Sequence, residues 1–172
     1  MSDYTLQATS PLGGYERKFG DLTIAEVVDQ KLYSIAAASF EQLLGMPAPA
    51  VGTSCQSTDQ KIELLRLQPD QVFLKCAEIP DELCSSGYVT DQSDSWVMLR
   101  VSGPGCRHAL RRTCMLDLDS GAFPAGAVAR TTMEHLSVII QCEGPVSFLL
   151  LSPRSSAKSF LHVIATSAHY VS

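Results

Sequence analysis

Trp96-Val-Met-Leu-Arg-Val101 is followed directly by Ser102-Gly-Pro-Gly105 and then by Cys106-Arg-His-Ala-Leu-Arg-Arg-Thr-Cys114. The first part alternates well enough to predict a β-strand. The glycines turn the chain, and Pro104 suits the first turn of a helix, where its missing N–H costs nothing. One face then carries apolar side chains at helical spacing: Cys106, Ala109, Leu110 and Cys114. The stretch therefore predicts a strand, a turn and a helix in succession.

Three further strands and a second helix are expected on the C-terminal side of this unit. The strands are predicted over Val128–Met133, Leu136–Cys142 and Val146–Leu151, with turns at Glu134-His135 and Glu143-Gly-Pro145. The helix is predicted over Ser155–Ser167, where Phe160, Leu161 and Ile164 form an apolar side. Residues 79–172 thus predict strand, helix, three strands and helix.

The N-terminal half predicts a smaller α+β lobe over residues 23–78, preceded by an extended lead-in over residues 1–22. We expect strands at Thr23–Val28 and Leu32–Ala37, although one continuous helix over Asp21–Leu44 is the competing interpretation. Ser39 and Gly45 bracket an expected short helix, and residues 46–60 are expected to form a loop. Ile62–Leu67 and Val72–Cys76 predict a hairpin around Pro69-Asp70. The fold class is therefore α+β with two lobes, the first of them ferredoxin-like.

Composition limits the classes of function. The chain has 172 residues, 45% of them hydrophobic, and a formal net charge of −5, which argues against a nucleic-acid partner. No apolar run is long enough for a transmembrane helix, and residues 1–10 have neither a basic leader nor an apolar stretch. We therefore expect a cytoplasmic protein without a membrane partner. Its six cysteines form no CxxC pair and are expected to be reduced.

No residue pattern predicts a catalytic, cofactor or metal site. Gly103-Pro-Gly105 lacks the third glycine of a dinucleotide loop, and Pro104 removes an amide that would bind phosphate. One helix cannot bring Cys106, His108 and Cys114 to one ion. The four histidines lie beside no nucleophile elbow. Loop and capping roles account for the main acidic group: Asp91, Asp94, Asp117 and Asp119.

A contact surface for a partner protein is the remaining candidate. Arg107 and Arg111 are four residues apart and share a face, with Arg112 beside it. They could bind phosphate or an acidic patch on a partner, although a solvated helix face also explains them. Trp96, the only tryptophan, is either a core anchor or an interface residue. The candidate interface residues are Trp96, Arg107, Arg111, Arg112, Phe123 and Arg130.

A series of short motifs runs along the chain: Ser10–Leu12, Leu67–Gln71, Val89–Trp96, Leu99–Cys106, Ala109-Leu110, Cys114–Leu118, Ala122–Gly126, Val128–Thr131 and Ser152–Ser155. In their order and spacing these motifs resemble the sarcosine oxidase gamma subunit family. The resemblance covers nearly the whole chain and depends on the series, since no single motif is specific. One departure is Leu67–Leu74, where the family often has a tryptophan-rich strand.

The resemblance implies a fold and a role. The family is related to the folate-binding aminomethyltransferases of glycine cleavage, so residues 79–172 should resemble the N-terminal domain of those enzymes. The heterotetramer of alpha, beta, gamma and delta subunits demethylates sarcosine oxidatively to glycine, hydrogen peroxide, and formaldehyde or methylene-tetrahydrofolate. The resemblance implies that FAD, FMN, NAD, zinc and tetrahydrofolate are bound by partner subunits. Gamma is then a non-catalytic scaffold that contacts mainly the alpha subunit.

Three other functions stay open at this stage. Sister complexes that act on dimethylglycine or N-methylglutamate carry gamma subunits of the same pattern, so the chain does not identify the amine. A stand-alone folate-binding one-carbon protein would need an acidic residue in a deep pocket, for which Asp91 or Asp94 is the candidate. An unrelated thiol or metal enzyme would use Cys106 and His108.

Overall fold

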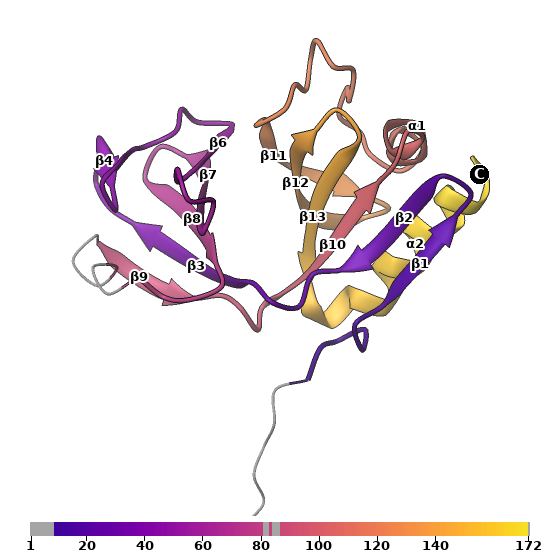
Figure 1. Ribbon diagram of the computed structural model, residues 1–172, viewed down its shortest axis with the longest axis horizontal. Helices are drawn as coiled ribbons and strands as arrows, with labels where there is room; N and C mark the ends of the chain where they lie inside the picture. The colour runs from indigo at the N-terminus through magenta and orange to yellow at the C-terminus, as the bar shows by residue number, and fades with distance from the viewer. Residues whose placement is uncertain (1–8, 81–82, 84–86, 172) are drawn as a thin grey trace, which may run out of the picture.

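Two antiparallel sheets lie side by side, and two helices cover the outer face of the larger sheet (Figure 1). The computed structural model describes residues 9–80, 83 and 87–171. The larger sheet has six strands in the order β1-β2-β10-β13-β12-β11, and the smaller has five in the order β6-β7-β8-β3-β9. The strands of the larger sheet are β1 (Glu16–Phe19), β2 (Leu22–Glu26), β10 (Trp96–Ser102), β11 (Val128–Met133), β12 (Leu136–Gly144) and β13 (Ser147–Pro153).

The smaller sheet is formed by the middle of the chain. Its strands are β3 (Lys31–Ala36), β6 (Thr53–Gln56), β7 (Ile62–Gln68), β8 (Gln71–Cys76) and β9 (Tyr88–Asp91), and a separate ribbon pairs β4 (Gln42–Leu43) with β5 (Met46–Pro47). The helices are α1 (Cys106–Arg111) and α2 (Ala157–His169), the latter preceded by the 3-10 turn η2 (Arg154–Ser156). No helix in the described part of the chain is long and apolar enough to cross a bilayer.

Alternating side chains give the central strands two buried faces. In β10, Leu99 and Val101 point toward the helices, whereas Met98 points toward the other sheet. In β13, Phe148 and Leu150 join the helix-side core, whereas Leu149 and Leu151 join the layer between the sheets. A strand that is buried on both faces carries a continuous apolar run, which explains Phe148–Leu151.

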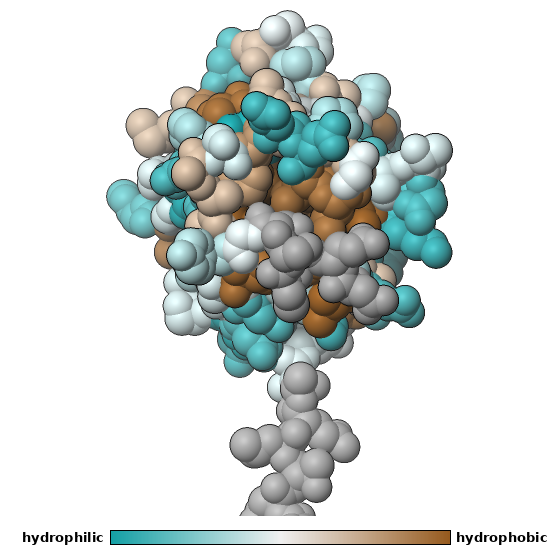
Figure 2. All heavy atoms as spheres, turned by 90° about the vertical axis from the view of Figure 1, so that its left-hand side faces the viewer, coloured by the Kyte–Doolittle hydropathy of each residue, from teal (hydrophilic) through white to brown (hydrophobic). Residues whose placement is uncertain are grey.

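The outer face of the smaller sheet holds a third apolar cluster. Tyr33, Ile35, Leu64, Val72 and Leu74 come from its strands. Phe40, Leu43 and Leu83 from the connecting segments pack over them. Figure 2 looks onto this side of the molecule and shows hydrophobic side chains gathered near its centre, with hydrophilic ones around them. This face is therefore covered by connecting segments.

The structure confirms several of the sequence predictions. The α+β class is confirmed, as is the order strand, helix, three strands, helix from β10 to α2. The hairpin of β7 and β8 pairs as predicted. The competing helix over residues 21–44 is wrong, because β2 and β3 occupy that range.

Three predictions in the N-terminal half are wrong. The short helix at residues 39–45 is replaced by β4, β5 and a turn in which Leu44 and Gly45 have φ of 53° and 73°. The expected loop at residues 46–60 contains β6. Within residues 31–80 the described chain has no α-helix, so the ferredoxin-like description of the first lobe, which requires helices against the sheet, does not hold.

Sheet membership also crosses the expected domain boundaries. β1 lies inside the predicted lead-in of residues 1–22 and pairs with β2. β2 was assigned to the first lobe, yet it pairs with β10 of the larger sheet. The chain therefore passes from one sheet to the other at residues 27–30 and returns at residues 92–95. The division of the chain into lobes at residues 23–78 and 79–172 stays a prediction.

Candidate functional site

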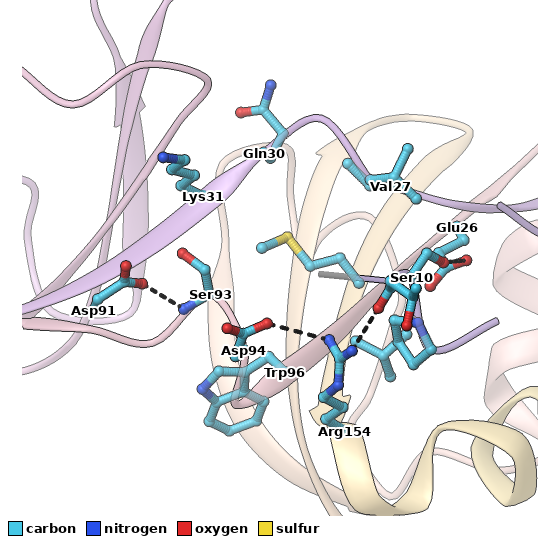
Figure 3. Close-up of a pocket in the computed structure, with 15 residues that line it drawn as sticks. Ser10, Glu26, Val27, Gln30, Lys31, Asp91, Ser93, Asp94, Trp96 and Arg154 are labelled. Atoms are coloured by element: carbon cyan, nitrogen blue, oxygen red, sulfur yellow. Dashed lines mark hydrogen bonds and ion pairs between the residues drawn. The ribbon is translucent and has the colours of Figure 1, made fainter. Parts of the chain in front are cut away.

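A cleft of about 510 Å³ opens where the chain passes between the two sheets (Figure 3). Its walls come from the first crossing, the return crossing, the N-terminal segment at residues 9–11, and Arg154 at the start of η2. Figure 3 shows Asp91, Ser93, Asp94 and Trp96 on one side and Glu26 with Ser10 on the other. The cleft is thus a consequence of the two crossings.

The N-terminal segment is tied down by a carboxylate and a guanidinium. Glu26 accepts hydrogen bonds from the Ser10 hydroxyl, from the Leu12 amide at 3.2 Å and from the Gly14 amide at 2.8 Å. Arg154 donates to the Thr9 carbonyl and forms an ion pair with Asp94, its Nη1 lying 3.5 Å from Oδ1. These contacts give Glu26 and Arg154 structural tasks at the mouth of the cleft.

The acidic residues of the cleft do not form an acid–base pair. Asp91 accepts a 2.9 Å hydrogen bond from the Ser93 amide, and hydrogen bonds from Ser93 hold the pKa of Asp91 below its ordinary value. Asp94 is 87% exposed at its side chain and is paired with Arg154. Asp91 ends β9, Asp94 lies in the segment that follows it, and both are exposed at the surface. Neither is the buried acid that a folate site of the expected kind requires.

A second, polar cleft of about 380 Å³ contains a buried network of charges between the sheets. Lys75 Nζ lies 2.6 Å from Glu63 Oε2 and 3.7 Å from Glu143 Oε1. Arg100 binds Glu143 through two bonds, from Nε at 2.7 Å and Nη2 at 2.9 Å. Gln141 donates to Glu63 and to Ser54 Oγ. The network joins β7 and β8 of one sheet to β10 and β12 of the other.

Burial makes these charges depend on one another. The side chains of Lys75 and Glu63 are 8% and 6% exposed, so neither charge is compensated by bulk water. Burial by itself would raise the pKa of Glu143. The hydrogen bonds and charge of Arg100, with the Ser147 hydroxyl and Lys75, outweigh that effect and hold this pKa below its ordinary value. Glu143 therefore stays ionised at neutral pH.

Sequence reasoning missed this network. A signal was present, because Glu63 and Lys75 interrupt the apolar runs Ile62–Leu67 and Val72–Cys76, and Gln141 interrupts the run of β12. Buried charges are nearly always paired, so each was a candidate for a partner. The pairing itself required knowing which faces of the two sheets meet.

The predicted interface residues lie in different environments. Phe123 is 7% exposed and belongs to the helix-side core. Arg107 turns inward: it donates to the carbonyls of Leu118, Phe123 and Pro145, and its guanidinium lies 4.9 Å from the Phe148 ring centre. These two side chains hold the segment after α1 in place.

The other four predicted residues reach the surface in two separate places. Arg111 pairs with Asp119 at 3.2 Å, and Arg112 lies 5.1 Å from the Tyr170 ring centre. Arg130 lies 5.8 Å from the Trp96 ring centre, and Trp96 packs edge-on against Phe73. Arg107 and Arg111 both contact the segment at residues 118–119, whereas Arg112 lies over Tyr170, so two of the three arginines lie together and the third lies apart.

The cysteines that lie in described positions are free thiols: Cys55, Cys76, Cys106, Cys114 and Cys142. Cys84 lies outside the described residues. Burial raises the pKa of Cys106 and of Cys114, which keeps them as uncharged thiols at neutral pH. His108 is exposed, whereas Cys106 is fully buried. Among the residues that the structure places, no three His, Cys, Asp or Glu side chains gather in a metal-binding group.

Comparison with solved structures defines the class of fold. The chain superposes on the glycine cleavage aminomethyltransferase T of Bartonella henselae with a TM-score of 0.55 and 15% identity, over 81% of this chain and 44% of the enzyme. The predicted likeness to the aminomethyltransferase fold is therefore confirmed. No family model matches the sequence.

A more specific likeness is to sarcosine oxidase, and it confirms the resemblance drawn from the motifs. Over 101 residues the chain is 32% identical to sarcosine oxidase subunit gamma of Corynebacterium sp. (strain P-1), a match over 54% of this chain and 49% of that protein. The match thus spans about half the length of this relative. A chain of the heterotetrameric sarcosine oxidase of Corynebacterium sp. U-96, solved with pyrrole 2-carboxylate, superposes with a TM-score of 0.82 and 22% identity, over 95% of this chain and 96% of the other.

Proposed function

We propose that this chain is the non-catalytic gamma subunit of a heterotetrameric sarcosine oxidase. The observation that carries the proposal is the combination of 32% identity to a gamma subunit over 101 residues with a superposition that covers both chains almost completely. In this assignment the chain supplies shape and contact surface. The partner alpha, beta and delta subunits carry FAD, FMN, NAD, zinc and tetrahydrofolate, and the complex works in the cytoplasm.

The geometry of the described residues supports a scaffold role. Polar groups that could act chemically are engaged in structural contacts: Glu26 and Arg154 fasten the N-terminal segment, and Arg107 holds the segment after α1. Buried Lys75 and Glu63 join the two sheets. A rigid two-sheet body with one helical outer layer suits a subunit that packs against larger neighbours.

The direct test is co-purification. The tagged chain, produced together with the other reading frames of its source operon, should be recovered with a flavin-containing partner, and the complex should oxidise sarcosine with release of hydrogen peroxide. The chain produced alone should show no flavin absorbance, because in this assignment the flavins are bound by the partner subunits. Recovery of the tagged chain without a partner from such cells would overturn the proposal.

The same experiment addresses the choice of amine. Sarcosine, dimethylglycine and N-methylglutamate would be offered to the purified complex at equal concentration. Sarcosine should give the highest kcat/KM. A preference for either of the other two amines would assign the chain to a sister complex that acts on that amine, and the scaffold role would stand.

Folate binding by the chain alone is the second candidate function, and its support is the fold shared with aminomethyltransferase T. The candidate acids Asp91 and Asp94 are exposed, and the match covers 44% of that enzyme. Calorimetric titration of the isolated chain with tetrahydrofolate distinguishes folate binding from the scaffold role. The scaffold assignment predicts no saturable binding at micromolar ligand.

A further inference from the structure

The helical layer is basic, although the chain as a whole is acidic. Residues 106–112 contain three arginines and α2 contains one lysine, and neither segment contains Asp or Glu. The chain has 13 Lys and Arg against 18 Asp and Glu, so the remainder carries nine basic and 18 acidic residues. Three of the four histidines also lie here: His108, His162 and His169. Of the three arginines, Arg107 turns inward and Arg111 is paired with Asp119, which leaves Arg112 as the arginine of this layer with no carboxylate partner among the described residues.

The two helices form one rigid surface. Ser167 Oγ in α2 donates a buried 2.6 Å hydrogen bond to the Ala109 carbonyl in α1. Phe160, Ile164 and Ala168 bury the inner side of α2 in the helix-side core. Figure 1 shows α1 and α2 on the side of the larger sheet that faces away from the smaller one, near the C-terminus. Their outer sides are exposed and face no further described element.

A shallow groove of about 260 Å³ lies on this surface, between the residues that directly follow α1, the outer side of α2 and the turn that joins β11 to β12. Tyr170 is 69% exposed at its rim, and the Arg112 guanidinium lies over the Tyr170 ring at 5.1 Å. No carboxylate of the described residues pairs with Arg112, whereas Arg111 is neutralised by Asp119. Val163 and the Tyr170 ring give the groove an apolar wall. Arginine and tyrosine are the side chains that most often dominate protein–protein affinity.

The neighbouring turn is held in an unfavourable backbone conformation. Glu134 and His135 have φ of 44° and 70°, a region that non-glycine residues avoid, and two-residue turns of this kind favour Asn-Gly. Glu134 also lines the groove. Residues held in such regions cluster at functional sites, where the surrounding structure keeps them in place.

We propose that this groove docks the acidic face of a partner protein, with a carboxylate on Arg112 and an apolar side chain against Val163 and Tyr170. The inference rests on the proposed function, since the partner is then a flavin-carrying subunit of the oxidase. The guanidinium of Arg112, to which no described carboxylate is paired, favours a single carboxylate on a protein surface. A nucleic acid fits less well, because its phosphate backbone requires several cations, whereas the described lining of the groove holds one arginine with Glu134 beside it.

The test compares two matched double variants in the assembled complex. The groove variant is Arg112→Glu with Tyr170→Ala. The control is Lys61→Glu with Tyr88→Ala, on the smaller sheet, where the side chain of Lys61 is 81% exposed and Tyr88 is 86% exposed. Each immobilised chain is titrated with the remaining subunits, purified together, and thermal unfolding of each free chain verifies that it is folded. The milder variant Arg112→Gln replaces the groove variant if the latter fails to fold.

The groove variant should lose affinity by about 100-fold, as expected for removal of two dominant contacts, and the control should stay within about threefold of the unmodified chain. Equal binding by the groove variant and the unmodified chain would overturn the proposal that the partner docks in the groove, and would leave the proposed function intact. Failure of the unmodified chain to bind any subunit would overturn the proposed function and this partner class together. Binding of a 20-base-pair DNA duplex or a single-stranded RNA at 150 mM salt, abolished by Arg112→Glu, would assign the groove to nucleic acid instead.

Discussion

The two faces of the six-stranded sheet are stabilised in different ways. Toward α1 and α2 the packing is almost entirely apolar, with Phe148, Leu150 and Phe160 fully buried. Toward the smaller sheet, one part is apolar around Met98 and Leu149, and another part is the charged network of Lys75 and its partners. Apolar packing is non-directional, whereas ion pairs and hydrogen bonds fix orientation. We infer that the charged network sets how one sheet is placed on the other.

The largest expected effect is the loss of one partner from the buried network. Lys75→Met should lower the free energy of unfolding by about 3–5 kcal/mol, because Glu63 would stay buried without a compensating charge. Urea denaturation at pH 7 measures the change. The double variant Glu63→Leu with Lys75→Met should recover most of the loss, since replacing both partners by apolar groups is often neutral. A stable Lys75→Met single variant would contradict the inferred role of the network.

The matching test on the helix side is Leu150→Ala. Leu150 is fully buried, so its truncation should cost about 2–5 kcal/mol from lost transfer energy and the cavity that remains. Thermal and urea denaturation should agree on this loss. Unlike the charged network, this face offers no second substitution that restores stability by removing a partner. If truncation of a single neighbouring side chain restored the stability lost in Leu150→Ala, the apolar and charged faces of the six-stranded sheet would not differ in the way inferred here.

The two arginines of α1 provide a sharper comparison within one helix. Arg107→Ala should cost about 1–3 kcal/mol, because the carbonyls of Phe123 and Pro145 lose a charged donor. Arg111→Ala should change stability by no more than about 0.5 kcal/mol, since its ion pair with Asp119 is exposed. Equal losses in the two variants would show that the inward contacts of Arg107 are not structural.

The smallest expected effect is a pH dependence that belongs to Glu143. Its pKa in the folded protein lies below the ordinary value of 4.5, so it binds a proton less readily when folded than when unfolded. The stability that it contributes is therefore fully present above pH 4.5 and is lost as the pH falls below that value through the folded pKa. Glu143→Gln should be less stable than the unmodified chain at pH 7, and the difference should shrink toward pH 3 (about one unit below the ordinary carboxyl range).

That prediction is tested by urea denaturation of both proteins in steps from pH 7 downward. Other carboxylates titrate in both proteins and cancel in the difference. A difference that stays constant over the whole range would show that Glu143 acts through its shape alone.

Local pattern was sufficient where neighbours in sequence are also neighbours in space. The hairpin of β7 and β8 and the series from β10 to α2 follow from periodicity and turn residues. The local sequence pattern did not predict the structure of segments whose pairing partners lie far away in the sequence. β2 and β3 are adjacent in sequence but pair in different sheets, and Ser39–Gly45 has helix-capping residues yet forms β4, a turn and the approach to β5. Pairing with long-range partners overrode local propensity in these segments.

The same limit explains the site residues. Phe123 and Arg107 were chosen as surface contacts because sequence spacing does not reveal which way a loop folds back. Charged residues inside apolar strands were visible at Glu63 and Lys75, but their contact depends on the meeting of two sheets. The resemblance to gamma subunits depends on the order of the motifs, which can be recognised in the sequence without knowing which residues are in contact.

The most direct test of the scaffold account is subunit omission. The oxidase would be produced from its operon with and without this reading frame, and flavin content, mass and sarcosine turnover would be measured on the purified products. The account predicts that omission leaves flavin bound to the other subunits while the tetramer fails to assemble and turnover falls. Unchanged assembly and turnover without the chain, or stoichiometric flavin and amine oxidation by the chain alone, would contradict it.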